Sequence, residues 1–169
     1  MMFVTVGSMF PFDRLIKAVD VMLVEGVIPL PVFGQIGDGE YLPRNFAYKR
    51  FLTNADFREQ VSRSSAIISH AGIGIISFAL EYGKPLIVLP RLQRYAEHVN
   101  DHQVATARKF AQLGHLMVAN STSELRAIMP RLADFIPISR VVNARRLAFR
   151  IGEILNEWGS ERDEESAHG

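Results

Sequence analysis

The amino-acid sequence predicts an α/β protein with a doubly wound, mainly parallel sheet. Short apolar runs typical of buried strands alternate along the chain with longer segments of helical periodicity. The clearest unit begins with the run 66–68, continues through a glycine turn and an apolar helix, and ends in the run 86–90. A strand, a helix and a second strand in this order form a βαβ unit, whose strands are parallel.

The composition predicts one compact domain over residues 1–158, followed by a short polar tail, 159–169, that is expected to be disordered. Hydrophobic residues make up 48% of the 169 residues, enough for a proper core. The formal net charge of +1 gives no reason to expect a nucleic-acid partner. The absence of cysteine excludes a disulfide scaffold, a thiolate metal site and a cysteine nucleophile.

The sequence also lacks the signals of membrane insertion. No apolar run reaches the roughly 18 residues needed to span a bilayer, and no basic region precedes the first apolar run as in a signal peptide. If the protein works at a membrane, another molecule is therefore expected to bring it there.

The part of the chain before residue 66 is expected to hold three strands and two helices. Residues 2–6 form the first strand, and the helix that follows ends at Gly26. Residues 27–36 contain two prolines and are therefore expected to be at best an edge or interrupted strand. A short strand within 46–52 and a short helix over 56–62 follow. The apolar face of the first helix consists of Phe12, Leu15, Ile16, Val19, Met22 and Leu23.

The helix after the glycine turn, residues 75–82, is apolar on every side, so we expect it to be covered all round. A polar loop is expected over 91–98 after the strand 86–90. The elements expected after this loop are a helix from Asn100 to Gly114, a strand over 116–119, a helix over 121–129 capped by Ser121 or Ser123, and a final helix over 139–158.

Three polar or glycine-rich segments fall where predicted strands end. They are Gly7-Ser8, the segment His70 to Gly74, and the segment 90–103. Ligands of doubly wound sheets bind beyond the carboxyl ends of the strands, so these segments are expected to converge on one site. Glycines allow close backbone approach, and the first amides of the following helix favour an anionic ligand.

Four sequence blocks, taken in order, resemble the donor-binding half of family 28 glycosyltransferases. They are FVTVGS at 3–8, SHAGIG at 69–74, GKPLIVLP at 83–90 and NDHQ at 100–103. The similarity extends over roughly residues 1–119, and more loosely over the final helix. It is greatest to small stand-alone subunits of split enzymes. One branch of these belongs to the UDP-GlcNAc transferase of the N-glycan pathway, and the other to bacterial exopolysaccharide synthesis with glucuronosyl transfer.

This resemblance implies a Rossmann-like domain that forms the carboxyl-terminal half of a GT-B enzyme. The implied activity is inverting transfer of a sugar from a UDP-sugar to a lipid-linked saccharide acceptor in surface polysaccharide synthesis. A membrane-anchored partner subunit would bind the acceptor, which places this chain in the cytoplasm, peripheral at the membrane through that partner. The UDP-sugar is a substrate, so no cofactor is expected.

One departure from the family pattern affects the expected donor. Relatives that use UDP-GlcNAc usually carry a glutamate in the helix after the glycine turn, where it would hold the ribose. The aligned position here is Phe78, and Glu81 lies about one helical turn further on. The missing glutamate favours the exopolysaccharide branch and a uronate donor. A UDP-GlcNAc transferase subunit and a non-catalytic nucleotide-sugar-binding regulatory module are the alternatives.

Several candidate donor-binding residues also have a purely structural interpretation. The glycines are equally typical of a tight βα turn, and His70 of a hydrogen-bonded packing residue. Asn100 or Asp101 suits a helix cap, and Arg91 or Arg94 either reads a uronate carboxylate or is a solvated loop charge. The expected donor-binding set is Gly7, Ser8, His70, Ala71, Gly72, Ile73, Gly74, Arg91, Arg94, Asn100, Asp101, His102 and Gln103.

No residue of this chain is assigned as the acceptor base, which is expected from the partner. The chain has no Asp-x-Asp pair, so no metal site is assigned. Met9 and Phe10 lie next to the expected cleft and are candidates to meet the partner. Arg145, Arg146 and Arg150 form a basic stripe on the expected final helix. It is either a solvated face or a contact with partner or membrane.

Overall fold

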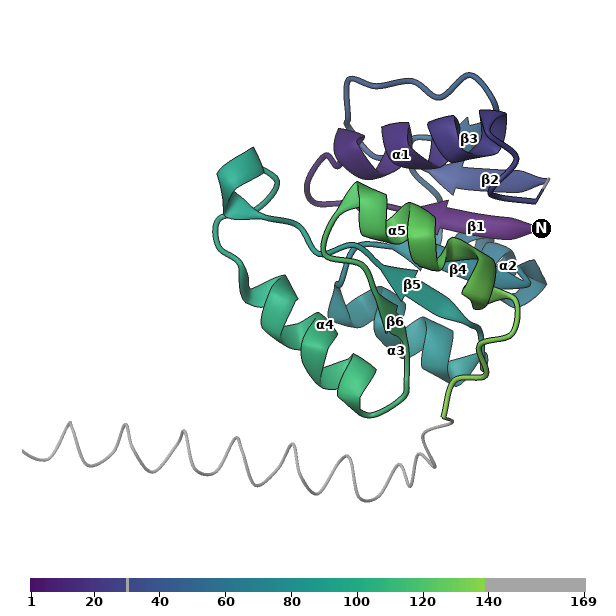
Figure 1. Ribbon diagram of the computed structural model, residues 1–169. Helices are drawn as coiled ribbons and strands as arrows, with labels where there is room; N and C mark the ends of the chain where they lie inside the picture. Colours follow the sequence, from purple (N-terminus) through teal and green to yellow (C-terminus); the bar gives the residue numbers. More distant parts are fainter. Residues whose placement is uncertain (30, 139–169) are drawn as a thin grey trace, which may run out of the picture. The chain divides into compact units, whose positions relative to one another are not determined.

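The structure, a computed structural model, describes residues 1–29 and 31–138, which fall within the compact unit Met1–Ser139 (Figure 1). The strands form one six-stranded sheet in the order β3-β2-β1-β4-β5-β6, and every neighbouring pair is parallel. The order reverses between β1 and β4, so the predicted doubly wound sheet is confirmed. The strands are β1 Met2–Thr5, β2 Val32–Gln35, β3 Ala47–Lys49, β4 Ala66–Ser69, β5 Leu86–Val88 and β6 Met117–Val118.

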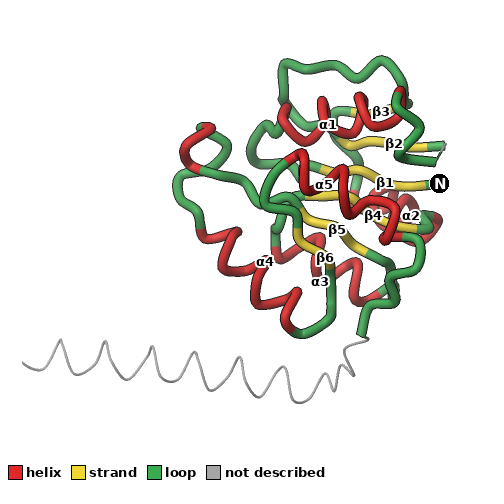
Figure 2. Tube along the Cα trace, in the orientation of Figure 1, coloured by secondary structure: helices red, strands yellow, loops and turns green. Residues whose placement is uncertain are grey.

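Helices cover both faces of this sheet, and each face has its own hydrophobic core. Successive residues of β1 point to opposite faces, so Val4 belongs to the core beneath α1 and α5, and Phe3 to the core beneath α2, α3 and α4. Figure 2 shows that a helix lies between successive strands along the chain, except between β2 and β3, which a loop connects. The helices are α1 Asp13–Val24, α2 Asn54–Arg63, α3 Ile73–Glu81, α4 His102–Gln112 and α5 Thr122–Ile128, with short 3₁₀ turns η1 Gln93–Tyr95 and η2 Met129–Leu132.

The helix ends follow local chemistry that the sequence signals. Gly26 and Gly114 lie just beyond α1 and α4 with positive φ angles of 71° and 70°. The hydroxyl of Ser121 accepts a hydrogen bond of 3.1 Å from the Glu124 amide and caps α5, so Ser121 rather than Ser123 is the cap. Of the two candidate caps of α4, Asp101 accepts no bond from the helix, whereas Asn100 Oδ1 accepts from the amide of His102, the first residue of the helix, at 3.2 Å.

Two expectations about these elements are wrong. In the segment 27–36, β2 begins only after the prolines, as expected of an interrupted strand, but it lies inside the sheet between β1 and β3 and not at an edge. Pro29 and Pro31 precede β2 and therefore cost it no ladder hydrogen bond. Helix α3 is not covered all round, since Ile75, Ile76 and Ala79 are buried but Ile73 is 58% exposed.

The predicted final helix 139–158, the tail 159–169 and the basic stripe of Arg145, Arg146 and Arg150 lie outside the described residues. The last of the described residues, Ile138, donates its amide to the Gly114 carbonyl at 2.9 Å. Within residues 1–29 and 31–138, none of the helices combines the length and the apolar character that crossing a membrane requires.

Candidate functional site

A cleft of about 660 Å³ opens beyond the carboxyl ends of β1, β4 and β5. It lies where the strand order reverses, the position at which doubly wound sheets bind ligands. The loop after β1, the turn between β4 and α3, and the loop after β5 all contribute to its walls, together with the first turn of α4. The three segments expected to converge therefore do so.

Part of the expected donor-binding set lies in this cleft, and part does not. Gly7, Ser8, His70, Gly72, Ile73, Gly74, Arg91 and Gln103 line it. Ala71 is buried behind the lining and contributes its amide to a hydrogen bond with Gln103. Arg94, Asn100, Asp101 and His102 do not line the cleft.

The amino-terminal end of α3 opens into the cleft. Gly72 is its N-cap and has no side chain to bond the first-turn amides, so the amides of Ile73, Gly74 and Ile75 have no helical acceptor. A Cβ built at Gly74 would meet no atom within 4 Å, so a ligand has free approach to this end of the helix. The exposed amides and the helix dipole both favour a negatively charged ligand here.

Arg91 adds a buried positive charge to the same cleft. Its side chain is 2% exposed, and its Nη2 donates to the carbonyls of Val6 at 2.6 Å and Phe10 at 2.5 Å. Burial lowers the pKa of this guanidinium to about 10, although Glu97 acts in the opposite direction, so Arg91 remains charged at neutral pH. Its Nε is buried and has no partner among the described residues. The interpretation of Arg91 as a solvated loop charge is therefore wrong.

Gln103 joins two of the loops that form the cleft. Its Oε1 accepts hydrogen bonds from the amides of Ala71 at 3.2 Å and Arg91 at 3.1 Å, and the residue is 3% exposed. The oxygen is therefore used within the protein. The side-chain Nε2 donates to no described residue, so it is the atom of Gln103 that remains for a ligand in the cleft.

His70 is held in a defined orientation at the base of the cleft. The Ser69 hydroxyl donates to the Thr5 carbonyl at 2.6 Å, so its oxygen accepts from His70 Nδ1 at 3.1 Å. This assignment leaves Nε2 of the neutral ring as an acceptor. Burial and, to a smaller extent, the charge of Arg91 together lower the pKa of His70 to about 3.

Gly72 provides the space that the His70 ring needs. A Cβ at Gly72 would lie 2.3 Å from His70 Nε2, and a Cβ at Gly7 would lie 3.0 Å from its Cε1. Gly7 also has a φ of 73°, which disfavours other residues. Gly72 and Gly7 therefore make room for the histidine ring, whereas Gly74 leaves room for a ligand.

Sequence reasoning missed the buried polar residues that hold these loops. Thr5 Oγ1 accepts from the Gly7 amide at 3.1 Å and donates to Gln35 Oε1 at 3.3 Å, and Gln35 Nε2 donates to the Gly7 carbonyl at 3.3 Å. Thr5 and Gln35 are each the last residue of an otherwise apolar strand, and this was the available signal.

The loop after β5 is held by an ion pair that also went unpredicted. Glu97 binds Arg14 bidentately, at 2.7 Å to Nε and 2.8 Å to Nη2, and is 7% exposed. Its Oε2 accepts the Leu92 amide at 3.0 Å, and Arg14 also donates to the Pro90 carbonyl at 3.0 Å. Glu97 lies in the loop 91–98, which was expected only to be polar, so its burial had no sequence signal.

The expected residues outside the cleft have local structural partners. Asp101 Oδ1 accepts from the Gln93 amide at 2.7 Å, and Asn100 Oδ1 accepts from the His102 amide at 3.2 Å. The guanidinium of Arg94 lies 4.9 Å from the centre of the exposed Tyr95 ring. These contacts shape the segment before α4 rather than the cleft wall.

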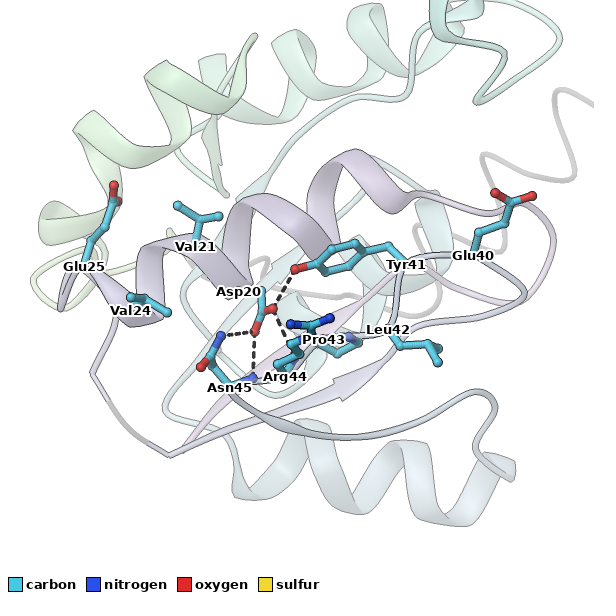
Figure 3. Close-up of a pocket in the computed structure, with 10 residues that line it drawn as sticks. All are labelled: Asp20, Val21, Val24, Glu25, Glu40, Tyr41, Leu42, Pro43, Arg44 and Asn45. Carbon is cyan, nitrogen blue, oxygen red and sulfur yellow. Dashed lines mark hydrogen bonds between the residues drawn. The ribbon is translucent and has the colours of Figure 1, made fainter.

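A second hollow, of about 850 Å³, lies between α1 and the segment 40–45 (Figure 3). Its buried carboxylate, Asp20, accepts from the Tyr41 hydroxyl at 2.7 Å and from the amides of Arg44 at 3.1 Å and Asn45 at 2.9 Å. Burial alone raises the pKa of Asp20, but these bonds and that from the Asn45 side chain outweigh it and lower the pKa. Asp20 is therefore fully used in anchoring this segment.

Comparison with known proteins agrees with this architecture. Residues 1–134 match the glycosyltransferase family 28 C-terminal domain. The human UDP-N-acetylglucosamine transferase subunit ALG13 is 32% identical over 123 residues, which cover 68% of this chain and 10% of that protein. The Candida glabrata subunit of the same name is 40% identical over 82 residues, covering 46% of this chain and 38% of the relative. The chain thus spans well under two thirds of these relatives.

Solved structures show the same fold. An NMR solution structure of ALG13 superposes with a TM-score of 0.56 and 23% identity, covering 86% of this chain and 93% of that one. The MurG crystal structure from Acinetobacter baumannii gives a TM-score of 0.54 and 21% identity, over 77% of this chain and 39% of that one. The parallel sheet, the cleft at its reversal point and the match over residues 1–134 lead to one conclusion: the chain belongs to the glycosyltransferase family 28 C-terminal domain family.

Proposed function

We propose that this chain is the donor-binding half of a two-component, inverting UDP-sugar glycosyltransferase. The proposal rests on a part of the cleft in which two groups carry positive charge. The first-turn amides of α3 and the buried guanidinium of Arg91, with its unpartnered Nε among the described residues, line the same cavity. A diphosphate would be stabilised there as charge develops on it when the sugar leaves.

The polarity of the cleft supports one orientation of the donor. Leu52, Phe57 and Phe78 line one part, which suits the flat face of a nucleobase. His70 and Gln103 also line the cleft, and their polar side chains suit sugar hydroxyls. With His70 Nε2 as an acceptor, this ring is suited to receive a hydroxyl hydrogen rather than to donate to a phosphate.

For the sugar, the relatives' names favour N-acetylglucosamine over the uronate expected from the sequence departure at Phe78. Both matched relatives are called UDP-N-acetylglucosamine transferase subunits. Arg91, the candidate reader of a uronate carboxylate, already donates to the carbonyls of Val6 and Phe10. We therefore propose UDP-N-acetylglucosamine rather than UDP-glucuronate as the donor. No observation supports an exopolysaccharide product.

The lining of the cleft supports an acceptor base on another chain. No Asp or Glu is among its lining residues within the described part of the chain. His70, whose pKa is lowered to about 3, is too weakly basic to take a proton from a sugar hydroxyl efficiently. Exposed apolar side chains at the cleft, Met9 and Val99, offer a surface for such a partner. We propose that this partner is membrane-anchored and binds a lipid-linked acceptor, with the present chain on its cytoplasmic side.

Ligand-induced thermal stabilisation tests the donor assignment. We expect UDP and UDP-N-acetylglucosamine to raise the unfolding temperature and uridine to have little effect, because the diphosphate provides most of the binding. A ligand at about 100 times its Kd adds roughly 2.7 kcal/mol to the free energy of unfolding. The sugar is tested by comparing UDP-N-acetylglucosamine with UDP-glucuronate. Indifference to every uridine nucleotide would contradict the proposal.

A matched pair of variants tests the contribution of Arg91 to this positively charged part of the cleft. Arg91→Met removes the buried charge and is expected to weaken UDP binding, whereas Arg94→Met removes a guanidinium outside the cleft and is expected to leave it unchanged. Circular dichroism and urea unfolding would establish that both variants are folded. Equal UDP affinity in folded Arg91→Met and in the unmodified protein would remove Arg91 from the site.

A further inference from the structure

A second histidine, His98, lines the cleft and has no part in the roles proposed above. It lies in the loop between β5 and α4, and its side chain is half-buried. Its ring packs against Phe10 of the loop after β1, with 4.9 Å between the ring centres. His98 is not among the donor-binding residues expected from the sequence, so the structure alone brings it to the cleft.

His98 lies close to the buried guanidinium of Arg91. The carbonyl of Phe10 accepts a hydrogen bond from Arg91 Nη2 at 2.5 Å, and the ring of the same Phe10 contacts the imidazole of His98. His98 is also near enough to His70 for its charge to lower the pKa of that ring. An anionic group that binds at Arg91 therefore lies near His98 as well.

One hydrogen bond determines which ring nitrogen of His98 remains for a ligand. Nδ1 accepts from the Asn100 amide at 3.4 Å, so the proton of the neutral ring is on Nε2. No hydrogen bond joins Nε2 to another of the described residues, so its N–H remains for a ligand. His70 has the opposite arrangement, with Nε2 as an acceptor. Of the two rings, only His98 offers an N–H to an anionic oxygen.

Only positive charges act on His98 from the described residues that surround it. Burial, a charge on His102 and the charge of Arg91 lower the pKa of His98 from its ordinary value of 6.5. The His102 ring lies 4.5 Å from that of His98, centre to centre. The loop 7–10 carries no charged side chain, and the neighbouring carboxylate, Glu97, is engaged in its buried ion pair with α1. Without a ligand, His98 is therefore neutral at neutral pH.

We propose that His98 is a further donor-binding residue: its Nε2–H donates to an oxygen of the diphosphate, and the ring takes up a proton when the donor binds. The inference rests on the proposed function, because it requires an activated sugar whose diphosphate lies at Arg91 and the start of α3. It adds regulation by pH to the same site.

The proton comes from the buffer and adds to Nδ1 of His98. There it replaces the long bond from the Asn100 amide, while Nε2–H keeps its bond to the phosphate oxygen. The negative charge of the diphosphate opposes the effect of Arg91 and His102, and so raises the pKa of His98 in the complex. Donor affinity should therefore increase as the pH falls from about 7.5 to about 5.5.

Titration calorimetry with UDP-N-acetylglucosamine on the unmodified protein tests this linkage. The diphosphate of this probe is esterified at both ends, so it does not titrate in the same range as the terminal phosphate of UDP does. In two buffers of different ionisation enthalpy at about pH 6.5, we expect uptake of about 0.3 to 1 proton per ligand. Binding without proton uptake would overturn the inference and leave the proposed function intact. Absence of binding would overturn the proposed function, and the inference with it.

Substitutions assign the proton to His98. His98→Gln keeps an amide N–H but cannot be protonated, so it should bind within about threefold of the unmodified protein at about pH 7.5 and lose the proton uptake. His98→Ala should weaken binding about tenfold. His115→Gln is the matched control, because His115 lies beyond the far end of α4, where its ring bonds the Ile138 carbonyl. Unchanged proton uptake in folded His98→Gln, or unchanged affinity in folded His98→Ala, would overturn the inference.

Nuclear magnetic resonance on the unmodified protein decides the matter if a variant does not fold. The Cε1–H resonance of His98 should titrate at a higher pH with UDP-N-acetylglucosamine bound than without it. An unchanged midpoint would show that the bound diphosphate does not act on this ring, and the inference would fail.

Discussion

At the scale of single residues, the cleft is shaped by the absence of side chains at its glycines and by the burial of a charged residue. Gly72 has φ −80° and ψ 140°, a conformation open to any residue, so its identity is explained by the His70 ring and not by the backbone. Arg91 remains charged in a place where charges are costly. Both residues were recognised from their sequence motifs, but neither the ring contact nor the burial has a signature in a linear pattern.

The two glycines of the turn should respond differently to an added methyl group. Gly72→Ala would place Cβ 2.3 Å from His70 Nε2 and is expected to lower the free energy of unfolding by about 1–3 kcal/mol, as overpacking does. Gly74→Ala meets no atom within 4 Å and should be neutral or stabilise by up to about 1 kcal/mol through helix propensity. Urea unfolding measures both values, and equal losses would contradict this account.

His70 should make stability depend on pH below neutrality. Its pKa is about 6.5 when unfolded and is lowered to about 3 when folded, so the unfolded state binds the proton first as the pH falls. Stability is therefore complete above pH 6.5 and is lost between about pH 6.5 and 3, with a slope near 1.4 kcal/mol per pH unit.

The comparison of the unmodified protein with His70→Gln isolates this contribution. Between pH 7 and 5, the unmodified protein should lose about 2 kcal/mol more than the variant, measured by urea unfolding at each pH. Asp20, whose pKa is lowered from 3.8, contributes only at more acidic pH and does not disturb this window. Parallel pH profiles of the two proteins would show that folding does not lower the pKa of His70.

At the scale of elements, the loop after β5 is organised by one buried ion pair rather than by helix or strand bonds. Glu97 joins this loop to Arg14 of α1 and to its own Leu92 amide. The sequence predicted the elements on either side of the loop from apolar periodicity. It did not predict the ion pair, because the partners lie 83 residues apart. The internal position of β2 in the sheet was not predicted either, because strand order depends on long-range pairing.

Removing this carboxylate should affect both stability and binding. Glu97→Gln leaves the Arg14 guanidinium without its anionic partner. Breaking a largely buried ion pair in this way lowers the free energy of unfolding by on the order of 3 kcal/mol, and by somewhat less here because Arg14 is partly exposed to water. UDP affinity should fall too, because Arg91 and His98 of the same loop line the cleft. Glu59→Gln is the matched control, since its pair with Arg63 is exposed and contributes about 0.5 kcal/mol or less. Equal effects in urea unfolding would contradict the role of Glu97.

At the scale of the whole molecule, the parallel arrangement explains why the site could be located from the sequence. All strands end at the same edge, so segments far apart in the chain, 7–10, 70–74 and 91–103, had to converge there. Which side chains of these segments face the cleft was not predictable. Arg94 and Asp101 are as polar as Arg91 and Gln103, but only the latter two are turned inward and buried.

The lack of a carboxylate in the described cleft leads to a prediction about turnover. The chain alone is expected to bind donor but to transfer sugar at a negligible rate, because no Asp or Glu lines the described cleft and the acceptor base is proposed to lie on the partner. Adding a membrane fraction that contains the proposed partner subunit should restore transfer. Incorporation of labelled sugar into lipid-extractable product measures it. Appreciable transfer by the purified chain alone would contradict this division of roles.

The double use of the Gln103 side-chain oxygen has a consequence for dynamics. Because Oε1 accepts from both the Ala71 and the Arg91 amides, it joins the turns after β4 and β5 to each other. Amide hydrogens at these two positions should therefore exchange slowly with solvent in the absence of nucleotide. Since the two turns are already ordered, ligand binding should cost little further conformational entropy in them. In Gln103→Ala the two amides should lose this protection together.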